Sequence, residues 1–286
     1  MLVNTKEMLL KANDSNYAIP SPDFINQNMI KDYIEVAEEL NSPALISISE
    51  GLSKYMPLED AYAVAEYYAK KASIPVALHL DHGKNVDFVK RAIDIGFPSV
   101  MIDASSESFE ENVARTKEIV EYAHKKNVTV EAEIGHVGSG INYEDESGDT
   151  SVYTEVEDLV KFVELTNVDS VAVSVGTAHG KYIGTPKINF ERLKELKEAV
   201  CIPLVLHGGS STGDENLKKC AEIGISKINI FTDICVAGGN SIKDLETDDY
   251  KEIITKADKA MKDMLKHYYE VFNCQESQEL KWVKKL

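Results

Sequence analysis

Short apolar runs alternate with longer amphipathic stretches along almost the whole chain. The runs are rich in Val, Ile and Leu and have the length of buried β-strands, whereas the stretches between them have helical spacing with one polar face. The predicted strands lie at residues 43–49, 75–82, 99–105, 129–135, 170–176, 203–209 and 227–233, with a weaker candidate at 16–22. The predicted helices lie at residues 26–40, 58–72, 86–95, 109–126, 155–166, 189–199 and 213–223, followed by a longer helical tail at 249–272.

This order of elements predicts an α/β fold. Strands that are apolar along their whole length are buried on both faces, as in a parallel sheet covered by helices. Eight alternating strands and helices predict a closed (β/α)8 barrel, or TIM barrel, and an open doubly wound sheet is the alternative. The chain has no low-complexity stretch and no obvious linker. We therefore expect a single barrel domain over residues 1–286, with an additional C-terminal helical tail.

Composition excludes several classes of protein. The formal charge of −17 disfavours binding to nucleic acid and to anionic membranes, because both need clustered Lys and Arg. No apolar run reaches the roughly 20 residues that span a bilayer, and the charged opening lacks the apolar core of a signal peptide. The four cysteines have no CxxC spacing, which argues against a disulfide framework and against a thiolate zinc site. We expect a cytoplasmic protein without a membrane partner.

Histidines gather where the predicted strands end, which is where barrel enzymes place their chemistry. His79 and His82 close one strand, His136 and His179 follow two others, and His207 closes a fourth. Three imidazoles with an open fourth position form a catalytic zinc site, so His82, His179 and His207 are the predicted ligands of one Zn²⁺. Spacing alone does not separate His79 from His82, and three imidazoles also suit cobalt or nickel.

Carboxylates occupy the same strand ends, where a buried acid needs a charged partner or has a raised pKa. Asp103, Glu131, Glu133 and Asp233 all lie at or near such ends. A divalent cation would be a partner for several of them; the alternative is that Glu131 and Glu133 share one face and pair with barrel lysines. Asp81, adjacent to a predicted metal ligand, is the predicted acid/base residue.

Two glycine-containing stretches, residues 176–182 and 206–213, have the composition of phosphate-binding loops. Glycines let backbone N–H groups approach an anion closely, hydroxyls add donors, and the following helix offers its positive end. The later stretch also has the position of the phosphate site that many barrels build after strands seven and eight. Its candidate residues are Gly208, Gly209, Ser210 and Ser211.

In order and spacing, six motifs resemble the zinc-dependent class II fructose- and tagatose-bisphosphate aldolases over residues 1 to 270. The motifs are LHLDHG, SVMIDAS, VEAEIG, GTAHG, PLVLHGGS and KINI. The resemblance implies reversible cleavage of a ketose (bis)phosphate between C3 and C4 into dihydroxyacetone phosphate and an aldehyde. The aldehyde is glyceraldehyde 3-phosphate if the substrate is fructose or tagatose 1,6-bisphosphate. It also implies a role in carbohydrate metabolism such as glycolysis, and a homodimer or homotetramer.

The resemblance also implies roles for individual residues. Asp81 would move a proton on the C4 hydroxyl, while Asp103 and Glu133 match acids around an alternative metal position. Gly180, Gly208 and Ser210 match groups around the phosphate of dihydroxyacetone phosphate and a nearby monovalent cation, Na⁺ or K⁺. Asn229 matches a residue that contacts substrate. The further expected substrate- or phosphate-binding residues are Ser49, Lys181, Gly209, Ser211, Phe231, Thr232 and Lys251.

One long polar insertion, residues 135–153, is expected to be a lid or binding loop, with a disordered surface insertion as the alternative. The family usually carries a loop glutamate that removes a proton from dihydroxyacetone phosphate. The insertion departs from the family's pattern here. Glu144 is the expected base, with Glu146 as the alternative.

Further departures bear on the substrate. The family's Ala-Phe-Asn-x-Asn stretch is replaced by PSPDFIN at residues 20–26, and Phe231 stands where fructose-type enzymes carry Asp and tagatose-type enzymes Ala. Cys235 replaces an Arg or Lys that the family uses for the distal phosphate. The family's C-terminal DPR segment reads DYK here, which leaves Lys251 as the candidate cation. A thiol offers neither the charge nor the paired donors of a guanidinium. We expect the 1-phosphate half of the substrate to be kept and the aldehyde half to be uncharged or less polar.

Two other functions fit parts of this pattern. A metal-dependent sugar-phosphate epimerase or isomerase on the same barrel would interconvert substrate without releasing triose phosphate. A noncatalytic companion subunit of an aldolase is disfavoured, because Asp81 and the three predicted zinc ligands are all present.

Overall fold

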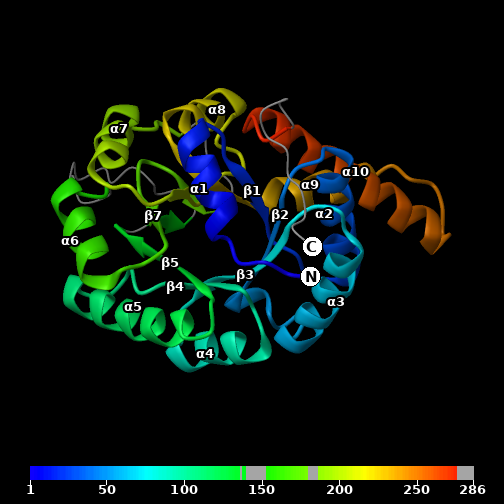
Figure 1. Cartoon of the computed structure of the whole chain (residues 1–286). Helices are drawn as coiled ribbons and strands as arrows, with labels where there is room; N and C mark the ends of the chain where they lie inside the picture. The colour runs from blue at the N-terminus through cyan, green and yellow to red at the C-terminus, as the bar shows by residue number, and fades with distance from the viewer. Residues whose placement is uncertain (136, 140–152, 180–185, 276–286) are drawn as a thin grey trace.

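The protein folds as a (β/α)8 barrel, seen in a computed structural model that describes residues 1–135, 137–139, 153–179 and 186–275 (Figure 1). Eight parallel strands form one sheet in the order β1-β10-β9-β7-β5-β4-β3-β2. They are β1 (Ile19–Pro22), β2 (Ala44–Ser49), β3 (Val76–Gly83), β4 (Ser99–Ile102), β5 (Thr129–Ile134), β7 (Ser170–Val173), β9 (Leu204–Leu206) and β10 (Ile225–Ile230). The closed barrel, rather than an open sheet, is therefore the correct prediction.

The barrel closes between its first two strands. The Phe24 backbone N–H donates to the Ser47 carbonyl at 2.9 Å, and the hydroxyls of Ser21 and Ser47 lie 2.5 Å apart. These contacts join the β1 edge to the β2 edge, so the carboxyl ends of all eight strands form one rim.

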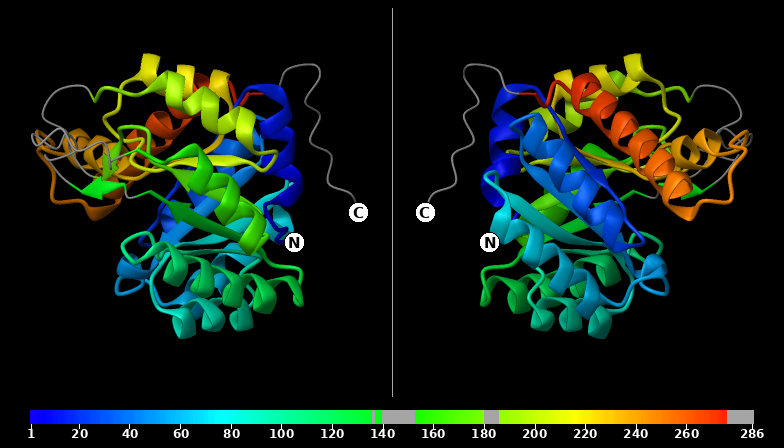
Figure 2. Two further views of the ribbon diagram at one scale, coloured as in Figure 1. Left: turned by 90° about the vertical axis from the view of Figure 1, so that its left-hand side faces the viewer. Right: turned by 90° about the vertical axis from the view of Figure 1, so that its right-hand side faces the viewer.

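Helices surround the strands (Figures 1 and 2). They are α1 (Lys6–Ser15), α2 (Gln27–Glu39), α3 (Leu58–Lys71), α4 (Val86–Ile95), α5 (Phe109–His124), α6 (Val156–Thr166), α7 (Phe190–Ala199), α8 (Asp214–Ile223), α9 (Thr232–Ser241) and α10 (Tyr250–Val271). Several begin at a side chain that accepts from the first turn: Asn85 accepts from two backbone N–H groups of α4, and Ser108 from one of α5. Such caps explain why the helical pattern starts where it does.

Two helices were absent from the sequence prediction. The first, α1, lies across the amino end of the barrel in Figure 1, where the Thr5 hydroxyl contacts those of Ser99 and Thr129. The second, α9, contains Gly238 and Gly239, which disfavour helix formation. A Cβ on Gly238 would lie 3.0 Å from Met261 Cγ, so this glycine allows α9 and α10 to pack closely.

Several predicted strands end earlier than the apolar runs suggested. The run 203–209 gives a strand that ends at Leu206, because Gly208 adopts a positive φ of 70°. The run 227–233 corresponds to a strand that begins at Ile225 and ends at Ile230, and α9 begins at Thr232. The residues beyond these strands form the loops of the rim. None of the helices in the described part of the chain is long and apolar enough to cross a bilayer.

Candidate active site

The end of β3 places two predicted functional side chains, Asp81 and His82, on the rim. His82 has a positive φ of 43°, which is uncommon for a residue with a side chain. The next residue must be small, because a Cβ on Gly83 would lie 2.4 Å from Val89 Cγ2 and 2.6 Å from the Met101 carbonyl oxygen. The strand pairing is irregular between Leu80 and Gly83, and the close packing at Gly83 restricts the backbone that carries His82.

Two imidazoles from opposite parts of the chain face each other. His82 Nε2 lies 2.7 Å from His207 Nδ1, although the two residues are 125 positions apart in sequence. The remaining nitrogen of each ring contacts a carboxylate: His82 Nδ1 lies 2.9 Å from Asp103 Oδ2, and His207 Nε2 lies 2.9 Å from Glu131 Oε1. Carboxylates that accept from the outer nitrogens direct the lone pairs of the inner nitrogens to one point.

This arrangement fits a divalent metal of the zinc type. When no ion lies between them, two ring nitrogens 2.7 Å apart must share a proton. Once that proton is lost, both nitrogens can bind a metal. Ligand atoms of Asp81, His82 and His207 all lie within 4.8 Å of one another. The donor set of imidazole nitrogens with an adjacent carboxylate is one that zinc accepts.

A second group of possible ligands contains His82, Asp103 and Glu133. Burial raises the pKa of Glu133 to about 7, with a further contribution from Asp103. Burial lowers the pKa of His82, but Asp81 and the Asp103 hydrogen bond outweigh burial and raise that pKa to about 10. Asp103 and Glu133 therefore lie close to His82, and their role at an alternative metal position stays a prediction.

A buried ion pair supports the site from inside the barrel. Lys227 Nζ lies 2.9 and 2.8 Å from the two carboxylate oxygens of Glu131, and both side chains are 1% exposed. His79 contacts the same lysine at 3.3 Å and the Ser99 hydroxyl at 2.8 Å. The alternative that Glu131 pairs with a barrel lysine is therefore what the structure shows, whereas Glu133 lies beside His82. His79 lies in this interior network, although it also groups with Asp81 and Glu131.

Asp81 lines a hollow of about 250 Å³ at the rim. Asn229 Nδ2 donates to Asp81 Oδ1 at 2.9 Å, which orients the carboxylate. The lining residues are Asp23, Ser49, Leu52, Asp81, His82, Gly208, Ser210, Asn229, Ile230, Phe231 and Thr232. The structure thus brings the predicted base, one predicted metal ligand and several predicted substrate-binding residues into one hollow.

The predicted phosphate loop has little freedom. A Cβ on Gly208 would lie 2.3 Å from the Ala178 carbonyl oxygen, and one on Gly209 would lie 2.6 Å from Ile228 Cγ2. Ser210 Oγ accepts from the backbone N–H groups of Phe231 and Asp233 at 3.1 and 3.3 Å. The loop is therefore tied to the start of α9, with its glycine backbone close to the hollow.

Two predicted substrate-binding side chains lie outside the hollow. Ser211 is exposed, with a positive φ of 63°, and it donates to Asp233 from both its N–H and its hydroxyl. Asp233 also accepts from Tyr268 at 2.6 Å, which links this loop to α10. The side chain of Lys251 is 86% exposed and pairs with Asp249 at 3.3 Å. Neither Ser211 nor Lys251 is among the residues that line the hollow.

Other predictions concern the undescribed parts of the chain. Gly180, Lys181 and Glu144 lie outside the described residues, as does His136. The backbone of His179 belongs to β8 (Ala178–His179), which pairs with β6 (Gly138–Ser139). The role of His179 as a third ligand remains a prediction.

Asp23 and Lys227 belong to the site but were not predicted. Lys227 stands inside an apolar strand, and that position is itself a signal, because a lysine there needs a partner. Asp23 follows β1 within the PSPDFIN stretch. Its Oδ1 atom is buried without a hydrogen-bond partner among the described residues. Burial, and then the neighbouring Asp81, raise the pKa of Asp23 well above its usual value.

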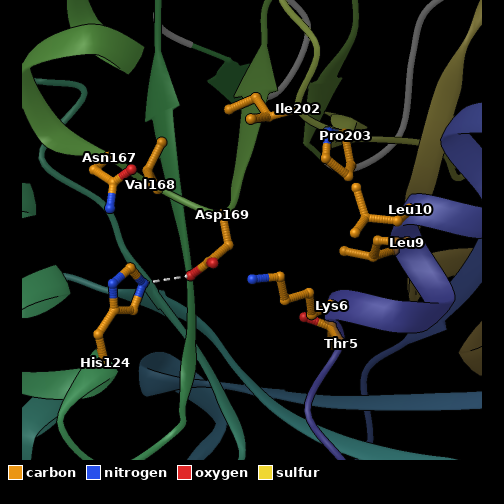
Figure 3. A pocket seen from close by; sticks show the side chains of 10 residues that line it. All are labelled: Thr5, Lys6, Leu9, Leu10, His124, Asn167, Val168, Asp169, Ile202 and Pro203. Atoms are coloured by element: carbon orange, nitrogen blue, oxygen red, sulfur yellow. Dashed lines mark hydrogen bonds and ion pairs between the residues drawn. The ribbon is translucent and has the colours of Figure 1, made fainter.

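A second hollow of about 320 Å³ lies beneath α1 (Figure 3). Its lining includes Thr5, which contacts Ser99 and Thr129 at the amino ends of their strands. Within it His124 Nε2 lies 2.8 Å from Asp169 Oδ2, the atom that also accepts from the Val130 N–H. Asp169 therefore fixes the backbone at the start of β5. Barrel enzymes place their catalytic residues at the carboxyl ends of the strands, so this hollow is not the candidate active site.

Comparisons with known proteins identify a matching family model and several similar solved structures. The family model described as fructose-bisphosphate aldolase class-II matches residues 3–277. The YdjI aldolase from Escherichia coli K12 is 34% identical, with a TM-score of 0.87 over 96% of this chain and 98% of that one.

Two further solved structures are similar. A putative fructose-1,6-biphosphate aldolase from Coccidioides immitis is 29% identical, with a TM-score of 0.84 over 94% of this chain and 96% of that one. The fructose-bisphosphate aldolase of Campylobacter jejuni is 24% identical, with a TM-score of 0.81 over 96% of both chains, and supports the fold alone.

Proposed function

Since the chain belongs to the class II fructose-bisphosphate aldolase family and is an aldolase, we propose that it uses zinc to cleave a ketose phosphate reversibly between C3 and C4. The products are dihydroxyacetone phosphate and an aldehyde. The observation that carries the proposal is the pair of facing nitrogens, His82 Nε2 and His207 Nδ1, beside Asp81 at the rim.

The metal would be held by His82 and His207, with His179 as the proposed third ligand. When bound, zinc would act as a Lewis acid that spreads the negative charge developing on the ketose oxygens during cleavage. Asp103 and Glu131 orient the two imidazoles through their outer nitrogens. Asp103 and Glu133 are the proposed ligands of the alternative metal position.

Asp81 takes the proton of the C4 hydroxyl as the aldehyde departs. Asn229 holds this carboxylate in place through its amide, leaving Asp81 directed into the hollow that admits the substrate. In the condensation direction, we assign removal of a carbon-bound proton of dihydroxyacetone phosphate to Glu144, with Glu146 as its alternative. Lys227 pairs with both oxygens of Glu131, so it is not the unpaired amine that Schiff-base catalysis needs.

The phosphate of dihydroxyacetone phosphate is assigned to the glycine loop after β9. Gly208 lines the hollow and has no side chain that would block an anion, and α9 begins beside it. The Gly209 N–H donates to the Asn229 carbonyl at 3.0 Å, so Gly209 shapes the loop. A monovalent cation, Na⁺ or K⁺, is proposed nearby. The further proposed contacts are Ser49, Gly180, Lys181, Ser210, Ser211, Asn229, Phe231, Thr232 and Lys251.

The aldehyde half of the substrate is proposed to be uncharged. Neither Lys nor Arg occurs among the described residues that line the hollow, and Phe231 contributes an apolar wall. A distal phosphate would lack the paired donors and charge of a guanidinium there. This favours a ketose 1-phosphate over a 1,6-bisphosphate. We also propose one domain over residues 1–286, a homodimer or homotetramer, and a cytoplasmic location.

The test is triose-phosphate release by zinc-loaded protein, with and without a chelator. The substrates are fructose 1,6-bisphosphate, tagatose 1,6-bisphosphate and ketose 1-phosphates with uncharged distal ends. We expect chelator-sensitive cleavage that is fastest on the 1-phosphates. His207→Ala should abolish it, whereas His124→Asn, which alters the hollow at the other end, should retain it. Interconversion of substrate without triose phosphate would instead indicate an epimerase.

A further inference from the structure

Asp23 is held in place by contacts from three sides. Its backbone N–H donates to the Ile230 carbonyl at 3.2 Å, and its carbonyl accepts from the Tyr33 hydroxyl at 3.1 Å. The next residue, Phe24, donates to Ser47 of β2. Contacts to β10, α2 and β2 therefore leave the backbone little freedom, and the residue lines the hollow beside Asp81.

The side chain of Asp23 has unused hydrogen-bonding capacity. Its Oδ1 atom is buried and lacks a partner within the described residues. A buried carboxyl oxygen without a hydrogen bond costs free energy, because its hydrogen bonds to water are lost and not replaced. Such a group in a ligand-sized hollow is best explained by a partner that the ligand brings.

The surroundings of Asp23 are unsuitable for an anion. Its electrostatic neighbours are Asp81, Tyr33 and Cys235, together with the cationic His82 and Lys227, which lower its pKa. The first three add no positive charge, and the two cations are already paired, His82 with Asp103 and Lys227 with Glu131. A phosphate placed here would face the carboxyl groups of Asp23 and Asp81 and would have to be desolvated without an unpaired cation to compensate.

We propose that Asp23 determines specificity for the aldehyde half of the substrate by hydrogen-bonding one of its hydroxyl groups and by excluding a phosphate. This rests on the proposed aldolase function and names its substrate class: ketose 1-phosphates whose leaving aldehyde carries free hydroxyls. A carboxylate would accept the hydroxyl proton, and a carboxylic acid would both donate and accept. Both protonation states therefore recognise a hydroxyl, and neither supplies a cation.

The experiment measures kcat/KM for condensation of dihydroxyacetone phosphate with three aldehydes. Propionaldehyde lacks a hydroxyl, glyceraldehyde carries two, and glyceraldehyde 3-phosphate carries the anion. Wild type should prefer glyceraldehyde to both others. Asp23→Ala should lower the preference for glyceraldehyde over propionaldehyde by about tenfold or more, since the hydroxyl loses its partner. Asp23→Asn, whose amide supplies N–H donors, should lower the preference for glyceraldehyde over its 3-phosphate by a similar factor.

Glu121→Gln is the matched control, because it removes one acidic charge from an exposed position of α5. It should leave all three ratios unchanged. Unchanged ratios in both Asp23 variants would overturn the proposal, as would a wild-type preference for glyceraldehyde 3-phosphate. Because each ratio is measured within one variant, partial misfolding of that variant does not change it.

Failure of the proposed function gives a different result. Wild-type protein that is an aldolase exchanges a carbon-bound proton of dihydroxyacetone phosphate with deuterated water in the absence of any aldehyde. Exchange with unchanged ratios overturns the role of Asp23 alone. Absence of both exchange and condensation overturns the proposed use of dihydroxyacetone phosphate and, with it, the inference.

Discussion

Glu131 holds two buried partners at once in the interior of the barrel. It accepts from Lys227 with both oxygens, and one of these oxygens also contacts His207 Nε2. Removing the negative charge of such a pair leaves a buried ammonium without compensation, which is far more costly than loss of a surface pair.

Glu131→Gln should therefore lower the free energy of unfolding by about 3 to 5 kcal/mol and weaken zinc binding by about 10- to 100-fold. Urea unfolding and a competitive zinc titration measure the two effects. Adding Lys227→Met removes the buried charge, so the double variant should regain stability without regaining zinc affinity. A loss below about 1 kcal/mol in the single variant would show that the ion pair is energetically minor.

At the end of β3, the position of His82 depends on Gly83. A Cβ there meets a side chain of α4 at 2.4 Å and a backbone oxygen of β4 at 2.6 Å. The backbone oxygen has no rotamer by which to move away.

Gly83→Ala should lower the free energy of unfolding by about 1 to 3 kcal/mol and displace the His82 ring, reducing zinc affinity. Gly51→Ala is the control, because no atom lies within 4 Å of the Cβ that it adds. Equal stability and zinc affinity in both variants would show that packing at Gly83 does not position His82.

At the scale of elements, α2 and α10 pack against each other through charged residues. Lys262 of α10 contacts Glu35, and Asn28 of α2 donates to Asp258. Asp32 is buried between them, and its Oδ2 atom is without a hydrogen-bond partner within the described ranges. Burial, and then Asp258, raise the pKa of Asp32 to about 6.

A raised pKa makes the folded protein bind a proton that the unfolded chain has already lost. Asp32 therefore reduces stability as pH rises from the ordinary value of 3.8 through about 6. Asp32→Asn should be more stable than wild type at pH 7.5, and the difference should shrink at pH 4.5. Urea unfolding at both values tests this against Asp60→Asn, an exposed acid of α3. An equal difference at the two pH values would contradict the assignment.

The elements differ in how well sequence predicts them. Apolar runs identified all eight strands of the barrel, because a strand buried on both faces has little room for polar residues. The pattern did not identify α9, whose glycines matter only through the partner helix α10. Likewise, Lys227 and Glu131 are each unusual in an apolar strand, but their pairing appears only when β5 and β10 face the same interior.

At the scale of the whole molecule, closure of the barrel assembles the site. His82 and His207 are 125 residues apart, and Asp81 and Asn229 are 148 apart. The sequence placed these residues at strand ends, and the shared rim brings them together. It could not show which atoms face each other, because that depends on the carboxylates that orient each ring.

Closure of the barrel also places the two hollows at opposite ends of the strands, and only the hollow at the rim contains predicted catalytic residues. The rim hollow contains Asp81, His82 and the glycine loop. The other, beneath α1, contains an aspartate that holds local backbone. Zinc loading should therefore protect His82, but not His124, from modification by diethyl pyrocarbonate, because both rings are partly exposed in the metal-free protein. Equal protection of the two in peptide mass spectrometry would contradict this separation.

The most direct test of the account is a zinc titration of chelator-treated protein, followed in parallel by bound metal and by triose-phosphate release. We predict that one zinc per chain restores activity in wild type, and that His82→Ala and His207→Ala neither bind that zinc tightly nor regain activity. Full activity in the chelated protein, or unchanged zinc binding in both variants, would contradict the central claim that these two facing imidazoles form the metal site.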